Sequence, residues 1–299
     1  HYGHIVVTNN KGDIIFSRGD VNYLTYFRSA AKPIQALEVI LSGAANHYNF
    51  NEAELAIMCA SHYGEDIHRE TVLNILQKLN LNKDTLQCGA TTSLNNDYAI
   101  SMALKGYGPD VLFNDCSGKH AGFLAVCKHQ NYNLNNYIAQ SHPLQKDIDN
   151  CIATLCLFPA KHIIHGIDGC GVPVHGMPLK NMAMGYANLA RPHQLEVTTA
   201  NACQQITSAM ALHPEMLSGT GGFCTALTKA TQGRLFGKIG AEAVYCVGNQ
   251  DTGQGMAIKL EDGNLWRLSP IVMKTLTDLN WVNEKEILAL RKFIEPENR

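Results

Sequence analysis

Short runs of β-branched and apolar residues lie near both ends of the chain. Residues 5–8 and 13–17 flank a polar turn at 9–12 and together predict a β-hairpin. Three more runs, near the other end, are typical of strands: 234–239, 243–248 and 255–260. An isolated hairpin is not stable in water, so we expect the first two strands to join the last three in one antiparallel sheet.

Between these strand regions, from about residue 51 to 230, apolar residues recur mostly at helical spacing. In residues 68–79, for example, Val72, Ile75 and Leu79 fall on one face. The other predicted helices of this middle part are 52–59, 99–104, 121–129, 143–157 and 194–212. Two further helices, 269–279 and 284–293, are predicted after the last strand.

This order of elements predicts an α/β (α+β) protein. An antiparallel sheet from the N- and C-terminal strands is flanked by helices and carries an inserted helical sub-domain. We expect one catalytic domain over residues 1–299. Its sheet sub-domain takes residues 1–50 and 231–299, its mainly helical sub-domain takes 51–230, and the site lies between the two.

Composition narrows the class of protein. The 299 residues are 45% apolar and 17% charged, which suits a globular protein with a large core. The net charge of −2 gives no basic face, so nucleic acid is not an expected partner. No apolar run reaches the roughly 20 residues that span a bilayer, and no signal-peptide pattern opens the sequence. The ten cysteines lack the spacing of a disulfide scaffold, so we expect reduced thiols and a cytoplasmic location.

The first candidate for chemistry is the stretch from Arg28 to Gln35, which precedes an apolar, helix-compatible segment. If Ser29 opens the helix, Lys32 lies one turn later on the same face, and Pro33 is tolerated in the first turn. A serine hydroxyl needs an adjacent base, and a lysine whose pKa is lowered can be that base. The alternative is an ordinary helix start with a surface lysine.

Four later stretches combine small and polar residues in ways that packing alone does not require. Residues 59–65 place Ser61 in a turn after a helix, and residues 237–242 place Lys238 on a glycine-flanked strand. Residues 114–122 and 166–173 are polar or glycine-rich loops. A helix cap, a plain turn and a solvated strand lysine are the alternatives for these stretches.

A Ser-x-x-Lys helix, a later loop serine and a later strand with Lys-x-Gly follow the element order of serine β-lactamases and penicillin-binding proteins. The whole set of motifs resembles the asparaginase II family, the Rhizobium-type L-asparaginases, which have a serine β-lactamase- and glutaminase-like fold. The blocks that carry this resemblance are 19–20, 28–35, 61–65, 114–122, 168–173 and 238–242. Two departures are Phe223-Cys224-Thr225, where an aspartate is expected, and Ala243, where glycine is expected.

The resemblance implies hydrolysis of L-asparagine to L-aspartate and ammonia through an acyl-enzyme. It implies two serine–lysine pairs, Ser29 with Lys32 and Ser61 with Lys238. Backbone N–H groups near Ser29 are expected to stabilise the oxyanion.

Further roles follow from the same resemblance. Asp168 is expected to hold the substrate α-ammonium, with Arg28 or His120 at its carboxylate. Family members bind zinc through two cysteines and a lysine, which correspond here to Cys116, Cys170 and Lys119, with one zinc expected per chain.

Several alternatives stay open at this point. A disulfide between Cys116 and Cys170 competes with zinc, and a related glutaminase or amidase competes with asparaginase. A non-catalytic zinc or amino-acid sensor would keep the same fold. His162 and His165 are three residues apart, but no third metal ligand is evident near them. The expected partners are a small-molecule substrate and a second copy of the chain in a homodimer, without membrane or nucleic acid.

Overall fold

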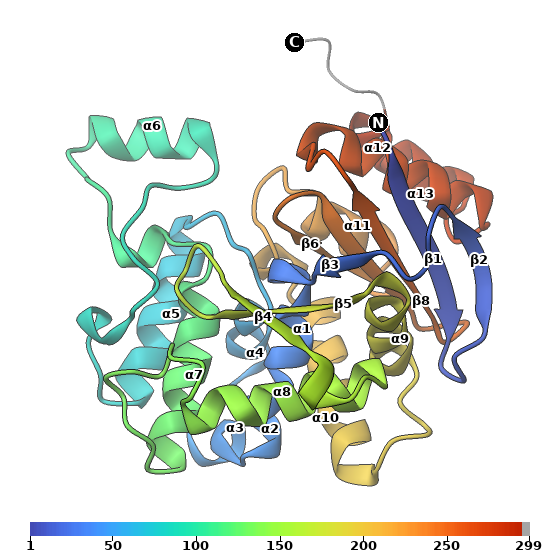
Figure 1. The fold of residues 1–299 in the computed structure, drawn as a ribbon. Coiled ribbons are helices and arrows are strands. Elements are labelled where there is room, and N and C mark those ends of the chain that lie inside the picture. Colours follow the sequence, from blue (N-terminus) through green and yellow to red (C-terminus); the bar gives the residue numbers. More distant parts are fainter. Residues whose placement is uncertain (295–299) are drawn as a thin grey trace.

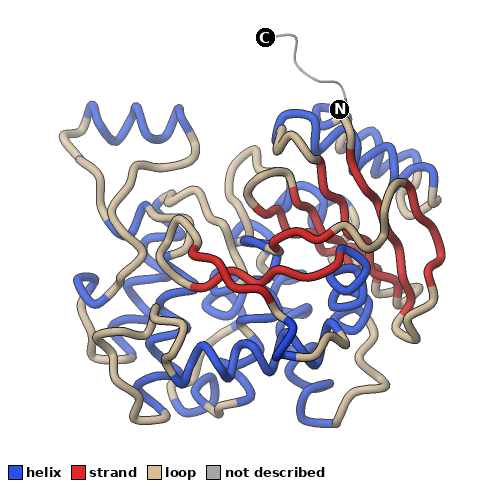
Figure 2. Tube along the Cα trace, viewed as in Figure 1, coloured by secondary structure: helices blue, strands red, loops and turns tan. Residues whose placement is uncertain are grey.

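The computed structural model describes residues 1–294, and its main sheet is antiparallel (Figures 1 and 2). The strand order is β2-β1-β8-β7-β6. The bounds of these strands are β1 Gly3–Asn9, β2 Ile14–Arg18, β6 Leu235–Gly240, β7 Val244–Asn249 and β8 Gln254–Leu260. The predicted antiparallel sheet from the two ends of the chain is therefore confirmed.

Strand β1 joins the two ends of the chain, because it pairs with β2 on one side and with β8 on the other. The β1–β8 register runs from Gly3 opposite Leu260 to Asn9 opposite Gln254. Val6, Val7 and every residue of β7 are buried, so the hairpin gains its stability from the sheet core.

Helix α9 (Leu179–Ala190) packs directly on this sheet. A Cβ on Gly255 of β8 would lie 2.0 Å from the carbonyl oxygen of Ala183, so only glycine permits this contact. The helices α11 (Phe223–Ala230), α12 (Leu265–Asp278) and α13 (Glu284–Ala289) also belong to the sheet part, where α11 contacts β6 and α12 contacts β7.

The remaining helices form the other part of the molecule (Figure 1). They are α1 Lys32–Gln35, α2 Leu37–Leu41, α3 Ala44–His47, α4 Glu52–Met58, α5 Asp66–Lys78, α6 Asn96–Leu104, α7 Ser117–His129, α8 Pro143–Cys156 and α10 Val197–Leu212. Short 3-10 turns connect several of them: Arg28–Ala31, Lys83–Thr85, Val111–Phe113, Ala160–His162, Pro214–Met216 and Arg291–Phe293. No helix within residues 1–294 is long and apolar enough to span a membrane.

A second, three-stranded sheet was not predicted. Its order is β3-β5-β4, from β3 Leu24–Tyr26, β4 Ile164–Ile167 and β5 Pro173–Pro178. The stretch 51–230 is therefore not helical throughout. These strands are short and contain glycine or proline, so periodicity does not reveal them. Their pairing nevertheless places the glycine-rich turn 168–172 of the β4–β5 hairpin beside the turn that carries Ser29.

Candidate active site

The Ser29 segment forms a tight turn instead of the regular helix start that we expected. Arg28–Ala31 is a 3-10 turn, and α1 begins at Lys32. Arg28 has a φ of 50°, in the left-handed region that a non-glycine residue rarely adopts. Strand β6 lies against this turn, because a Cβ on Gly240 would meet the Phe27 carbonyl oxygen at 2.9 Å. Ser29 and the lysine strand are thus brought together.

Lys32 and Lys238 donate to the same hydroxyl. Lys32 Nζ lies 3.0 Å and Lys238 Nζ 2.8 Å from Ser61 Oγ. Ser61 is buried, and its backbone N–H donates to the Leu217 carbonyl. Ser29 is only half-buried, and among residues 1–294 its side chain forms no hydrogen bond with Lys32. The geometry is therefore one serine between two amines, instead of two separate pairs.

The two amines differ in their electrostatics. Burial and the positive charge of Lys32 lower the pKa of Lys238 to about 8. Burial also acts to lower the pKa of Lys32, but the charges of Cys116 and Asp115 outweigh it and raise that pKa. Near neutral pH, Lys238 is the amine that most readily gives up its proton.

Asp115 is a member of the site that sequence reasoning missed. Its carboxylate lies 3.3 Å from Lys32 Nζ. Burial alone would raise its pKa, but Lys32, His62 and Lys238 lower it to about 2, so Asp115 is an anion that keeps Lys32 charged. The available signal was its place in the polar loop 114–122, between two residues that we did single out.

A hydrogen bond holds two of the predicted loops together. His62 Nε2 lies 2.9 Å from Ser117 Oγ, and both residues are fully buried. Burial lowers the pKa of His62 well below its usual value, so the ring is neutral. At the adjacent Gly118, a Cβ would lie 2.4 Å from the Ile57 carbonyl oxygen, which explains the glycine in this motif. These contacts fix Ser61 and the start of α7 relative to each other.

Arg28 and Asp168 form a paired unit beside Ser29. The Nε and Nη2 atoms of Arg28 donate to Asp168 Oδ1 at 3.1 and 2.9 Å, and Nη1 donates to Glu242 at 2.8 Å. The N–H of Gly169 also donates to Oδ1. Within residues 1–294 the three hydrogen bonds to Asp168 all use Oδ1, and Oδ2 accepts none.

His120 lies in the interior of the protein. It is fully buried, and Nδ1 lies 2.8 Å from the hydroxyl oxygen of Tyr137. Its Nε2 atom has no hydrogen-bond partner in the described part of the chain. His120 therefore lies next to the cysteine cluster, with one ring nitrogen that has no partner among the described residues.

Cys116, Lys119 and Cys170 do lie together. Lys119 Nζ is 3.1 Å from Cys170 Sγ, and all three side chains are buried. A hydrogen bond from Cys116 lowers the pKa of Cys170 far below its usual value, while the same bond raises that of Cys116. Both cysteines are free thiols. The Cys170 thiolate is a ligand that zinc favours, whereas the pKa values of Cys116 and Lys119 are raised, so zinc would have to displace a proton from each.

The model of the L-asparaginase II family matches residues 1–299, the whole chain. The chain belongs to the L-asparaginase II family. Family membership supports an amidohydrolase and confirms the resemblance drawn from the motifs.

The solved structures that this chain resembles include two β-lactamases and a D-alanine carboxypeptidase. This asparaginase II family member is 12% identical to a putative β-lactamase from Bacteroides dorei DSM 17855, over 92% of this chain and 93% of that one, with a TM-score of 0.45. A β-lactamase from Mycobacterium bovis is 12% identical over 98% and 95% of the two chains, with a TM-score of 0.42. A D-alanine carboxypeptidase from Burkholderia cenocepacia is 11% identical over 98% and 92%, with a TM-score of 0.40. No curated protein matches the sequence.

Proposed function

We propose that this protein is an L-asparaginase that hydrolyses L-asparagine to L-aspartate and ammonia through a serine–lysine acyl-enzyme. The observation that carries the proposal is the shared hydroxyl of Ser61, which accepts hydrogen bonds from both Lys32 and Lys238 beside the Ser29 turn. Burying two amines costs free energy, and a protein that only binds a ligand gains nothing from placing both on one hydroxyl.

In this mechanism Ser29 is the nucleophile, since it is half-buried and free of a strong partner, whereas Ser61 is buried between two amines. Neutral Lys238 takes a proton through the Ser61 hydroxyl from Lys32, which leaves Lys32 as the neutral base for Ser29. Ser29 Oγ attacks the side-chain amide carbon, and the proton returns by the same route to the leaving ammonia. Water then hydrolyses the acyl-serine.

Backbone N–H groups near Ser29 would stabilise the developing oxyanion, an effect worth about 3 kcal/mol per donor. For substrate recognition, we propose that the free Oδ2 of Asp168 binds the α-ammonium. Arg28 fixes that carboxylate through Oδ1 and contributes positive charge for the α-carboxylate.

Ammonia release from asparagine by the purified protein tests the proposal, with glutamine measured in parallel. Ser29→Ala is expected to lower kcat by several orders of magnitude while circular dichroism stays unchanged. Ser61→Ala is expected to lower kcat as well, by interrupting proton transfer between the lysines. Normal turnover of Ser29→Ala with loss in Ser61→Ala would instead make Ser61 the nucleophile.

A related glutaminase or amidase is the second candidate, because one methylene in the substrate changes binding by only about 1–3 kcal/mol. The Arg28–Asp168 unit would bind the α-ammonium and α-carboxylate of any α-amino acid, so it does not discriminate between substrates by side-chain length. A higher kcat/KM for glutamine than for asparagine would decide for this candidate. If the protein releases no ammonia from any of a broad panel of amides, the result would favour a non-catalytic zinc or amino-acid sensor.

We propose zinc at Cys116, Lys119 and Cys170 as a separate feature of the enzyme. When bound, zinc would supply positive charge near the substrate pocket, while the serine–lysine chemistry proceeds on the chain's own residues. If mass spectrometry shows Cys116 linked to Cys170 and the protein contains no zinc, the two cysteines form a disulfide and this proposal is wrong.

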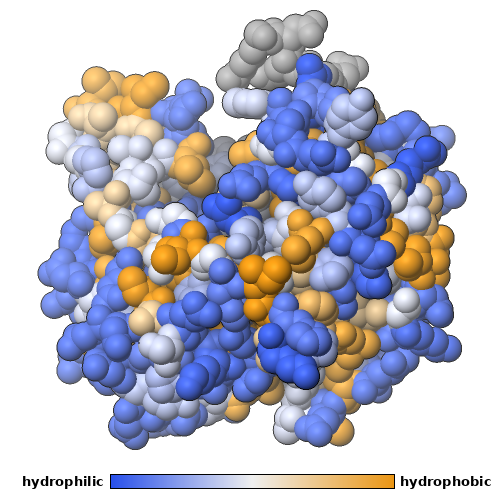
Figure 3. Space-filling view, viewed as in Figure 1, coloured by the Kyte–Doolittle hydropathy of each residue, from blue (hydrophilic) through white to orange (hydrophobic). Residues whose placement is uncertain are grey.

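A homodimer and a cytoplasmic location complete the proposal. Support for a second copy comes from an apolar surface over α6, where Ile100, Leu104 and Tyr107 are exposed (Figure 3). Light scattering of the wild type and of Leu104→Glu tests the dimer, which the charged side chain is expected to weaken. Support for the location comes from the ten cysteines, which are all free thiols.

A further inference from the structure

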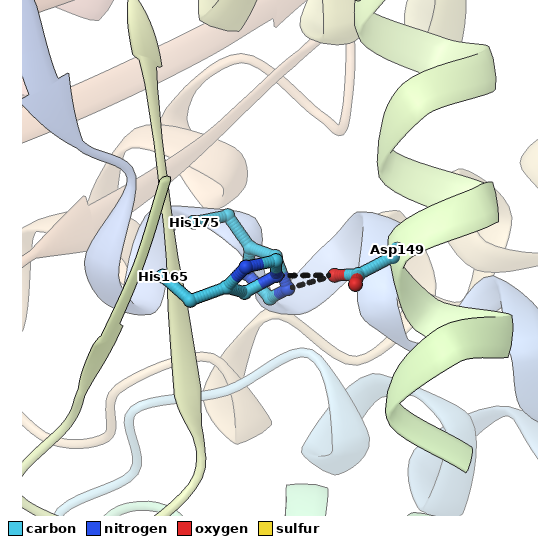
Figure 4. Close-up of side chains that lie close together, drawn as sticks. All are labelled: Asp149, His165 and His175. Atoms are coloured by element: carbon cyan, nitrogen blue, oxygen red, sulfur yellow. Dashed lines mark hydrogen bonds and ion pairs between the residues drawn. The ribbon is translucent and has the colours of Figure 1, made fainter. Parts of the chain in front are cut away.

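Three side chains outside the proposed chemistry converge on one point. His165 of β4 and His175 of β5 are directly opposite each other in the hairpin, and Asp149 faces them from α8 (Figure 4). Nε2 of His165 lies 2.9 Å and Nε2 of His175 lies 3.0 Å from the same oxygen, Oδ1 of Asp149. Two imidazoles and one carboxylate are thus held in place by three elements, β4, β5 and α8.

The arrangement follows from the local structure. Directly opposite residues of an antiparallel pair place their side chains on the same face of the sheet. The hairpin presents this face to α8, so the helix supplies the third group. A metal ion needs several donor atoms close together. Within residues 1–294, Asp149, His165 and His175 form the one cluster of three histidine, cysteine or acidic side chains that meets this need.

The buried histidine provides a second, independent observation. His175 is 1% exposed, and neither of its ring nitrogens forms a hydrogen bond in the described part of the chain. Its Nε2 lies within ion-pair distance of the Asp149 oxygen. Buried polar atoms without a partner are rare, because they lose their water without compensation. A nitrogen lone pair used as a metal ligand would remove this cost.

We propose that Asp149, His165 and His175 bind a divalent transition metal, with zinc as the preferred ion. Zinc takes neutral imidazole nitrogen and carboxylate oxygen, and three protein ligands leave a fourth position for water. Partial exposure of His165 and Asp149, at 14% and 20%, gives access to that position. Because it has nitrogen and oxygen donors, this site is chemically distinct from the thiol cluster of Cys116 and Cys170.

The bound metal would join α8 to the β4–β5 hairpin. The turn of that hairpin, residues 168–172, contains both Asp168 and Cys170, which the proposed function uses for the substrate and the first zinc. The metal at the new site would therefore hold the hairpin in position, and it has no part in the reaction itself. The proposal does not depend on which amide the enzyme hydrolyses.

Zinc content in a Cys170→Ser background tests the new site without interference from the thiol cluster. After dialysis against zinc and removal of the excess, this protein is expected to keep about one zinc per chain. Adding His165→Ala is expected to remove that zinc, whereas adding His162→Ala should not. His162 is a matched control, because it is an exposed histidine three residues away that lies outside the cluster.

Three further measurements separate loss of the metal site from misfolding of a variant. His165 is chosen over the fully buried His175, and circular dichroism checks each variant. Zinc is expected to raise the Tm of the Cys170→Ser protein but not that of the protein that also carries His165→Ala. Cobalt in the Cys170→Ser background should give a spectrum without thiolate charge transfer. No zinc in the Cys170→Ser protein, or equal zinc with and without His165→Ala, would overturn the proposal and leave a hydrogen-bonded network.

Discussion

The lowered pKa of Lys238 gives a pH dependence that can be worked out from the structure. The proposed mechanism needs one neutral amine of the pair, and Lys238 has a pKa of about 8. Its neutral fraction is then about 9% at pH 7, about 50% at pH 8 and about 90% at pH 9. We expect kcat/KM for asparagine to rise about tenfold from pH 7 to 9 and to level off above that.

The assay is initial-rate ammonia release at fixed ionic strength, with enzyme stability checked at each pH. An ordinary lysine, with a pKa of 10.5, would instead give a rate that still rises about eightfold between pH 9 and 10. Lys238→Arg keeps the positive charge but cannot supply a neutral amine, so its activity should be lost at every pH. Lys259→Met is the matched control, since Lys259 is another buried lysine of the same sheet that does not reach Ser61.

Three outcomes would refute this reasoning. A profile that is flat between about pH 6 and 9 would mean that no lysine titrates in the reaction. A midpoint near that of an ordinary lysine would mean that burial and the charge of Lys32 do not act on Lys238 as the structure indicates. Activity retained in Lys238→Arg would show that the residue supplies only charge.

Three further predictions concern stability and metal content. Ala243 is a buried residue with a φ of 57°, so Ala243→Gly should raise stability in urea unfolding by about 0.5–1 kcal/mol; a loss would mean that its methyl contact outweighs the strain. Burial raises the pKa of Glu38 from 4.5 to about 7, so the folded state holds the proton more tightly and stability falls as pH rises from 4.5 through 7. Glu38→Gln should remove that fall and gain about 3 kcal/mol at pH 8, which unfolding at pH 5 and 8 would measure. Cys170→Ser should remove one zinc and raise KM for asparagine; unchanged metal content would contradict the thiol site.

The sequence predicted those parts of the fold whose signal lies within one element. Residues 68–79 have a clear helical face, and the five strands of the main sheet are apolar runs between turns, so both were confirmed. The second sheet was missed because β4 and β5 owe their strand conformation to pairing across a glycine-rich turn. Helix α9 was missed for a related reason, since it is buried on nearly all sides and has no polar face.

The candidate site shows the same limit. Spacing within a motif pointed to Ser29, Lys32 and Lys238, but it could not tell that Ser61 would accept from both amines. The pairing depends on how β6 meets the Ser29 turn, which is a tertiary contact. The burial of His120 could not be predicted either, because a histidine in a polar motif has the same sequence signal whether it faces solvent or the interior.

The position of β1 between β2 and β8 has a consequence for how the chain folds. β8 ends at Leu260, so β1 lacks its inner neighbour until more than 250 residues have been synthesised. Contacts between such distant segments form slowly, and an unpaired strand edge is open to association with other chains. During synthesis the edge of β1 that later pairs with β8 therefore stays exposed until β8 has been made. Fragments that end before β8 should aggregate, and chaperones that shield that edge should raise the yield of the complete chain.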